Sequence, residues 1–211
     1  SYESDILKME EVSLDGIAKK IKTPLYCYSV SQIKYNFEEL KNSFSNCKPL
    51  ICYAVKANFN KNIIRILGQL GAGADVVSMG ELKQCLKNGI SKKKIVFSGV
   101  GKTFEEINFA VKSQIKQINV ESEEELEEVI EICKKQKKKI DVGLRINPNV
   151  DAQTHQKIST GRFEDKFGIP ETKIVSIFQK FKNNGYANIN CVSTHIGSQI
   201  RSLSPFKLAF K

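Results

Sequence analysis

The sequence predicts an α/β protein with a parallel sheet, and specifically an incomplete (β/α)8 TIM-type barrel. Short apolar runs alternate with longer segments in which apolar residues recur every three or four positions, as in successive βα units. The short runs are apolar at nearly every position, which is typical of strands covered on both faces. About six such units can be counted, whereas a closed barrel has eight.

The N-terminal part of the chain is expected to lie outside the barrel. Residues 1–24 are mostly polar and weakly patterned, so we assign them to a separate segment and place the barrel domain at residues 25–211. Thr23-Pro24 is expected to introduce a short strand over Leu25–Tyr28. An amphipathic helix capped by Ser31 should follow, with these residues on its apolar face: Ile33, Phe37, Leu40 and Phe44.

The six predicted units begin with Leu50–Val55, an apolar run that leads directly into Lys56. The later strands are expected at Gly73–Val77, Ile95–Phe97, Ile115–Val120, Ile140–Ile146 and Ile189–His195. The helices between them are expected to bury one face each: Ile63, Ile64, Leu67 and Leu70; Leu82, Cys85 and Leu86; Ile107, Ala110 and Val111; Leu126, Val129, Ile130 and Cys133; and Ile174, Ile177, Phe178 and Phe181.

A doubly wound sheet is the competing architecture for this alternation. Its dinucleotide-binding form would place a G-x-G-x-x-G motif after the first strand and at the start of a helix. Gly71-Ala72-Gly73 instead precedes a predicted strand, and the third glycine is absent. A barrel therefore fits the sequence better.

The end of the sequence accounts for the missing units. Ser204 is expected to cap a helix that has Pro205 at its first position, and Phe206 begins an apolar face. The sequence stops at Lys211, after less than two turns of this helix. We therefore expect a truncated barrel that exposes strand edges and apolar helix faces.

Composition excludes several classes of protein. With 211 residues, 41% hydrophobic and 27% charged, the chain is expected to be soluble and globular. The net charge of +10 comes from lysines spread along the chain without interleaved aromatics, so no nucleic-acid partner is expected. No apolar stretch approaches the roughly 18 residues of a membrane span, so no membrane association is expected. The six cysteines include no CxxC pair, and most lie inside apolar patterns, as buried thiols of a cytoplasmic protein would, so no metal site is expected.

Lys56 is the first residue that points to chemistry. Alternation along the strand places Leu50, Cys52, Ala54 and Lys56 on one side, which faces the barrel interior. Lys56 then stands at the carboxyl end of the strand, where barrel active sites lie. A desolvated amine at this point is expected to be neutral and able to form a Schiff base.

Other polar groups fall at the ends of the following strands and should converge on the same barrel face. They are found in Asp75–Glu81, Ser98–Gly101, Asn119–Ser122, Arg145–Asn147 and His195–Gln199. Structural roles compete with chemical ones at several of these positions. Three pairs have the spacing of a capping box: Ser78 with Glu81, Thr103 with Glu106, and Ser122 with Glu125.

His195 and the turn that follows it suggest a cofactor. Arg145 could simply pair with a carboxylate at a strand end, and His195 could be a core histidine. The residues after His195, however, form a glycine-serine turn at Gly197-Ser198 that suits a phosphate. An imidazole at the same barrel mouth could stack on an aromatic ring. An amine, a stacking imidazole and a phosphate-binding turn together indicate pyridoxal phosphate, an electron sink for a carbanion.

Several segments carry a resemblance to a known family. YAVKAN (Tyr53–Asn58) resembles the cofactor-lysine motif of the barrel-type, alanine racemase-like pyridoxal-phosphate decarboxylases, and GADVVSMGEL (Gly73–Leu82) resembles their next strand and helix. NPNVDAQTHQKISTG (Asn147–Gly161), KFGI (Lys166–Ile169) and HIGSQI (His195–Ile200) are similar to the diaminopimelate decarboxylases in particular. The similarity extends from about Thr23 to the end of the chain.

The resemblance implies a role for each candidate residue. Lys56 would be the catalytic residue and would bind pyridoxal 5'-phosphate covalently. Asp75 would lie beside this attachment, His195 would stack on the cofactor ring, and Ser198 would lie near its phosphate. Glu81 and Arg145 would act as electrostatic supports. The implied reaction is decarboxylation of meso-2,6-diaminopimelate to L-lysine and carbon dioxide, the last step of lysine biosynthesis.

The same resemblance implies features outside this sequence. The full-length protein would be a homodimer with shared active sites, acting on a small amino-acid substrate. A C-terminal β domain would be joined by residues 1–24. Two alternatives remain at this point: a decarboxylase of ornithine or arginine, and a non-catalytic homologue that binds pyridoxal phosphate and has a regulatory role. This fragment alone is expected to be inactive.

Overall fold

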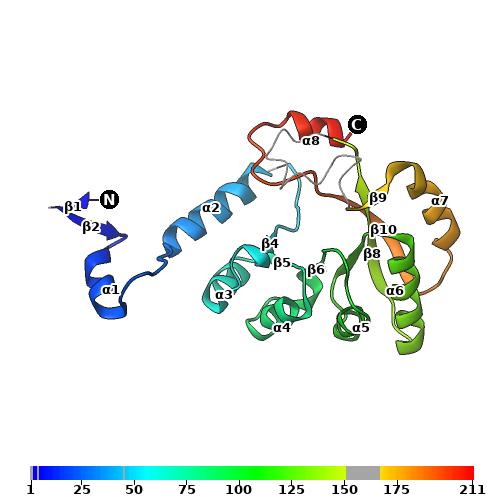
Figure 1. Cartoon of the computed structure of the whole chain (residues 1–211), viewed down its shortest axis with the longest axis horizontal. Coiled ribbons are helices and arrows are strands. Elements are labelled where there is room, and N and C mark those ends of the chain that lie inside the picture. The colour runs from blue at the N-terminus through cyan, green and yellow to red at the C-terminus, as the bar shows by residue number, and fades with distance from the viewer. Residues whose placement is uncertain (1, 4, 45, 151–166) are drawn as a thin grey trace.

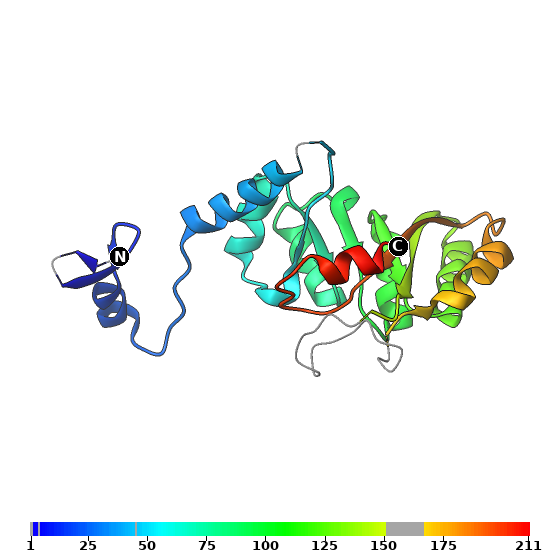
Figure 2. The ribbon, with the colours of Figure 1, turned by 90° about the horizontal axis from the view of Figure 1, so that it is seen from above.

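The computed structural model describes residues 2–3, 5–44, 46–150 and 167–211. A curved parallel sheet forms the centre, helices follow one another around one side of it, and a small N-terminal unit projects away (Figures 1 and 2). None of the helices in the described ranges is long and apolar enough to cross a membrane.

The sheet confirms the predicted fold class. Six parallel strands lie in the order of the sequence, from β4 at one edge to β10 at the other. A seventh, β9, pairs with β8 away from this path. The strands are β4 (Cys52–Ala54), β5 (Gly73–Val76), β6 (Ile95–Phe97), β7 (Gln117–Val120), β8 (Ile140–Asn147), β9 (Ile169–Pro170) and β10 (Ala187–Thr194). Sequential parallel order with a helix after each strand is the arrangement of an incomplete barrel.

Five helices alternate with the strands and cover the outer face of the sheet. They are α3 (Lys61–Gln69), α4 (Met79–Lys87), α5 (Phe104–Ser113), α6 (Glu123–Gln136) and α7 (Glu171–Phe181). The main core lies between these helices and outward-facing strand residues such as Val76, Phe97 and Val120, each of which is completely buried. A smaller core joins α3 to α2 (Val30–Ser43) through Phe37, Ile63 and Leu67.

Most of the predicted helix faces are buried, with exceptions on three helices. On α2, Phe37 is buried, but Leu40 is exposed and so is Phe44 just after the helix. On α6, Ile132 is buried in the place expected for Ile130, which packs at the edge of the core. On α7, Ile177 is fully buried whereas Phe178 is exposed. The spacing of apolar residues predicts the face of a helix correctly but does not define how far its edges are covered.

The N-terminal residues form structure that the sequence did not predict. Strands β1 (Tyr2–Glu3), β2 (Ile6–Met9) and β3 (Val12–Ser13) make a small antiparallel sheet, followed by helix α1 (Leu14–Ile21), which has no buried residue. Glu10 connects this unit to α2. Its carboxylate accepts hydrogen bonds from the backbone N–H and hydroxyl of Ser31 and from the Ser29 hydroxyl, and these bonds lower the pKa of Glu10 to about 2.

Some local predictions were wrong. The strand expected at Leu25–Tyr28 is absent, because no neighbouring strand pairs with these residues. Ser29, not Ser31, caps α2 by accepting a hydrogen bond from the backbone N–H of Gln32. The last helix, α8 (Ser204–Ala209), begins at Ser204, so Leu203 occupies the cap position expected for that serine.

Candidate active site

Lys56 follows the first strand of the sheet in a tight turn. Strand β4 ends at Ala54, because β5 pairs only with Cys52, Tyr53 and Ala54, and a 3-10 turn, η1 (Val55–Ala57), then carries the lysine. Completely buried Val55 anchors this turn from below. The Tyr53 hydroxyl fixes its exit by donating a 2.9 Å hydrogen bond to the carbonyl of Asn58.

The predicted environment of Lys56 was only partly correct. Its side chain lies at the carboxyl end of the sheet as expected, but it is exposed, so the expected desolvation was wrong for the described part of the chain. The turn is the reason, since it carries the lysine beyond the last paired residue of the strand. Among the described residues the amine has no hydrogen-bond partner, and this leaves its lone pair or proton accessible.

Asp75 lies at the end of β5, on the strand adjacent to β4, and is half-buried. Burial raises the pKa of its carboxyl group, while the hydrogen bond from Ser98 and the charges of Lys56, His195 and Arg145 oppose this effect. These electrostatic interactions show that three strand ends and one turn converge on the same place. The predicted convergence of Lys56, Asp75, Arg145 and His195 is therefore present in the structure.

Arg145 is held by a carboxylate from the neighbouring strand end. Its guanidinium donates a 2.5 Å hydrogen bond to Glu121, and the two side chains are 14% and 8% exposed. The ring of Phe167 lies 5.5 Å from the guanidinium carbon. The second Glu121 oxygen accepts a 3.0 Å hydrogen bond from the backbone N–H of Gly168. Glu121 thus fixes both Arg145 and the residues that enter β9, a role that sequence reasoning missed.

His195 follows β10 directly. Partial desolvation, together with the charges of Arg145 and Lys56, lowers the pKa of its imidazole, and Asp75 acts in the opposite direction. The neutral imidazole is therefore favoured near neutral pH. Ser198 lies three residues later in a turn where Gly197 and Gln199 both have positive φ, at 142° and 57°. Ser198 is exposed and does not line the cavity described next.

A cavity of about 360 Å³ lies at this end of the sheet. Lys56, Arg145 and His195 line it, and Val77, Gly99, Val100 and Phe167 complete its wall. Its size falls within the range of small-molecule sites. Two buried hydroxyl groups close to His195 in the sequence, those of Ser193 and Thr194, have no hydrogen-bond partner in the described part of the chain.

Glu81 does not line this cavity. Its carboxylate accepts a 2.8 Å hydrogen bond from the backbone N–H of Val77, and Ser78 caps α4 by accepting from the N–H of Glu81. The pair is therefore not a complete capping box, unlike Thr103 and Glu106, which make both reciprocal bonds. Glu81 contributes to the site indirectly by holding Val77, which is a wall residue.

Glu125 also does not complete the capping box expected with Ser122. Ser122 caps α6, but the Glu125 carboxylate accepts hydrogen bonds from the N–H of Glu121 and from the amine of Lys102. That amine also donates to the carbonyls of Gly99 and Asn119, at 2.7 and 2.6 Å. Lys102, whose side chain is 1% exposed, thus joins two loops next to the cavity.

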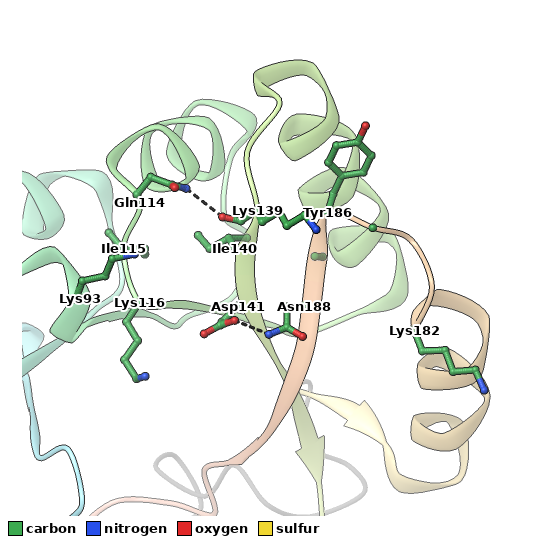
Figure 3. A pocket seen from close by; sticks show the side chains of 12 residues that line it. Lys93, Gln114, Ile115, Lys116, Lys139, Ile140, Asp141, Lys182, Tyr186 and Asn188 are labelled. Atoms are coloured by element: carbon green, nitrogen blue, oxygen red, sulfur yellow. Dashed lines mark hydrogen bonds between the residues drawn. The ribbon is translucent and has the colours of Figure 1, made fainter.

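A second cavity, of about 460 Å³, lies at the opposite end of the sheet, where the strands begin (Figure 3). Four of its twelve lining residues are lysines, and a 2.8 Å hydrogen bond joins Asn188 to Asp141 within it. Lys182 points away from the cavity. In TIM-type barrels this face contributes to stability and the carboxyl-terminal face to catalysis, so we place the candidate site at Lys56.

The insert that distinguished the resemblance can be followed only in part. Residues 151–166, which include most of NPNVDAQTHQKISTG and the first residue of KFGI, lie outside the described residues. The remaining residues of KFGI contribute Phe167 to the cavity wall and Gly168 to the contact with Glu121. Gly168 has a φ of +82°, and its backbone approaches that of β8 closely, so a side chain there would be strained.

Comparison with known proteins gives consistent matches. Residues 30–211 match the family described as "Pyridoxal-dependent decarboxylase, pyridoxal binding domain". A diaminopimelate decarboxylase of Aquifex aeolicus is 44% identical over 211 residues, which is 99% of this chain and 49% of the relative. One from Helicobacter pylori is 46% identical over 184 residues, covering 87% and 45% of the two chains.

A solved structure agrees with these matches. The crystal structure of diaminopimelate decarboxylase from Helicobacter pylori complexed with L-lysine superposes with a TM-score of 0.90 at 43% identity, over 92% of this chain and 50% of that one. The chain spans about half the length of the curated relatives it matches.

Proposed function

This chain belongs to the pyridoxal-dependent decarboxylases, as their pyridoxal-binding domain, and from that premise we propose that the protein converts meso-2,6-diaminopimelate to L-lysine and carbon dioxide. The observation that carries the proposal is the convergence of Lys56, Asp75, Arg145 and His195 at one end of the sheet. The substrate assignment is supported by the relatives of 44% and 46% identity and by the L-lysine bound in the Helicobacter pylori enzyme.

The residues present fit pyridoxal phosphate. An aldehyde requires a primary amine, and Lys56 presents one at the cavity without a competing hydrogen bond among the described residues. An aromatic ring suits the planar imidazole of His195 in the cavity wall. A phosphate suits the Gly197–Gln199 turn, because Gly197 and Gln199, on either side of Ser198, have positive φ, and such a turn can direct backbone N–H groups toward an anion. The hydroxyls of Ser193 and Thr194, unpaired among the described residues, lie on opposite faces of β10, so one of them at most could supply a further donor.

In the proposed mechanism, this chain's residues hold the reacting groups and balance their charge. When bound, pyridoxal phosphate supplies an electron sink for the carbanion left after carbon dioxide departs. Lys56 would hold the cofactor covalently through its side-chain amine. Asp75 balances the positive charge at the Lys56 nitrogen, with which it interacts electrostatically. His195 in its neutral form would lie against the cofactor ring, and the Glu121 carboxylate keeps Arg145 in place as a fixed cation.

Further proposals concern the whole protein. We propose a cytoplasmic homodimer with shared active sites, and these features rest on the resemblance alone. We also propose that residues 1–24 pack against a β-rich domain. The position of the small N-terminal sheet, away from the barrel, and the absence of buried residues in α1 support that assignment (Figure 2). Ser198 is proposed to lie near the phosphate, and Glu81 to support the site through Val77.

The test is release of carbon dioxide by the full-length gene product, with diaminopimelate, ornithine and arginine as separate substrates. We expect turnover of diaminopimelate, and no turnover by Lys56→Ala. Lys92→Ala, which removes an exposed lysine far from the cavity, is the matched control and should retain full activity. Preference for ornithine or arginine would overturn the substrate assignment. Binding of pyridoxal phosphate without turnover of any of the three would favour a non-catalytic homologue.

A further inference from the structure

A row of polar side chains crosses the inner face of the sheet and ends at Asp75. The Ser98 hydroxyl, after β6, donates a 2.5 Å hydrogen bond to the Asp75 carboxylate. The Asn119 side-chain N–H donates a 3.1 Å bond to the Ser98 oxygen. The side-chain N–H of Gln117 in turn donates a 2.7 Å bond to the Asn119 carbonyl oxygen. Three strands are therefore connected by side chains alone.

The donors in this row all point the same way. A serine hydroxyl has one hydrogen, and the N–H of Asn119 occupies an acceptor position on the Ser98 oxygen, so the Ser98 hydrogen is directed at Asp75. Gln117 fixes Asn119 in the orientation that this requires, because it occupies the carbonyl end of that amide. Asn119 is buried, so water does not compete for its amide group. A hydrogen bond donated by the Ser98 hydroxyl is stronger to an ionised carboxylate than to a neutral one, so the row favours the ionised form of Asp75.

The neighbouring strand is shaped to leave room for this row. Gly143 on β8 pairs with Asn119 in the register of the sheet. A Cβ atom at Gly143 would lie 2.3 Å from the Asn119 carbonyl oxygen and 2.8 Å from the Gln117 side-chain nitrogen. Any other residue would therefore displace both amides. The glycine has an ordinary φ, so the space it leaves, and not backbone freedom, is what the site requires.

We propose that Ser98, Asn119 and Gln117 are positioning residues that act through one another to hold Asp75 ionised and oriented toward Lys56. This inference rests on the proposed function, because it assigns the purpose of the row to the lysine that binds the cofactor. None of the three residues lines the cavity. The charged and titratable groups that face Asp75 from the surrounding elements are Cys52, Lys56, Arg145 and His195. The row supplies the single uncharged donor to Asp75 among the described residues.

The test is the titration of Asp75 in the full-length gene product without cofactor. The carboxyl carbon of Asp75, labelled with 13C-aspartate and assigned by its loss in Asp75→Asn, is followed by NMR as a function of pH. Ser98→Ala and Asn119→Ala should each move the midpoint to higher pH, because each removes or releases the hydrogen bond that stabilises the carboxylate. Since Asn119 acts through Ser98, Asn119→Ala should add nothing in the Ser98→Ala background.

A second measurement follows the affinity of the same variants for pyridoxal phosphate. Ser98→Ala should weaken binding about tenfold, the effect of losing one hydrogen bond to a charged group. Ser176→Ala, which removes an exposed serine on α7, is the matched control and should leave both the midpoint and the affinity unchanged. If Ser98→Ala does not fold, Asn119→Ala carries the test alone with the same expected midpoint shift.

Three outcomes would overturn the inference: an unchanged midpoint in Ser98→Ala, a midpoint moved to lower pH, or a full Asn119→Ala effect in the Ser98→Ala background. The result is independent of turnover. If the wild-type protein decarboxylates diaminopimelate while the midpoint stays unchanged, the inference fails and the proposed function stands. If the midpoint shifts but the wild-type protein neither binds pyridoxal phosphate nor decarboxylates, the row is real and the proposed function fails.

Discussion

Replacing Glu121 by glutamine should destabilise the protein far more than the loss of one surface charge. The carboxylate accepts from Arg145 with one oxygen and from the Gly168 N–H with the other. A glutamine has a single acceptor oxygen and can satisfy only one of these donors. The loss has two parts: about 1–2 kcal/mol because the remaining bond is no longer charge-assisted, and about 1–3 kcal/mol for the donor left unpaired. We expect a total of roughly 2–5 kcal/mol.

The assay is urea unfolding followed by circular dichroism, with Glu131→Gln as the matched control. Glu131 pairs with Lys135 on the exposed face of α6, where both side chains are more than 60% exposed. Water and salt screen that pair, so its loss should fall within the error of the measurement. If Glu121→Gln costs no more than Glu131→Gln, Glu121 does not hold Arg145 and Gly168 in the way described.

Three further predictions test other parts of the structure. Lys102→Met should lower the free energy of unfolding by about 3–5 kcal/mol in urea, because it leaves the Glu125 carboxylate, 11% exposed, without its buried partner; a loss below 1 kcal/mol would contradict this. The lowered pKa of His195 means that the unfolded chain binds more protons than the folded one below about pH 6.5, so stability should rise with pH through that window. The rise should become smaller in His195→Gln, and an equal rise would refute the assignment. A thiol reagent should modify exposed Cys47 in the native protein but Cys85, whose pKa burial raises to about 12, only on unfolding; mass spectrometry of the peptides distinguishes the two.

The outer layer of the fold could be predicted from the sequence because its signals are local. Strands such as Ile95–Phe97 are apolar throughout, since helices cover one face and the barrel interior lies on the other. The register between strands is not a local property. The sequence predicted that Leu50–Val55 would be a strand, whereas pairing with β5 ends at Ala54 and a turn follows. That difference exposes Lys56.

The residues of the candidate site could be predicted from the sequence, but the contacts that support them could not. Its residues were identified from their positions at strand ends, and the structure brings Lys56, Arg145 and His195 to one cavity. The supporting contacts could not be found in this way, because they join residues far apart in the sequence. Glu121 and Gly168 are 47 positions apart, and their contact depends on how β9 returns to β8.

The N-terminal strands could not be predicted from the sequence because they are too short. Strands β1 and β3 have two residues each, and four residues make β2, so no alternating pattern can develop. The Ser29 cap of α2 was assigned to Ser31 because both serines precede the same apolar face. Both serine hydroxyls donate to Glu10, and only the Ser29 oxygen also accepts from the backbone N–H of Gln32, which the three-dimensional structure alone shows.

The central claim is that Lys56 is the residue that binds pyridoxal phosphate, and one measurement tests it directly. The full-length gene product is incubated with pyridoxal phosphate, reduced with borohydride, digested and analysed by mass spectrometry. We predict a stable cofactor adduct on the peptide that contains Lys56, and its absence from the Lys56→Ala variant. An adduct on a different lysine in the wild-type protein, or one that persists at the same level in Lys56→Ala, would contradict the account.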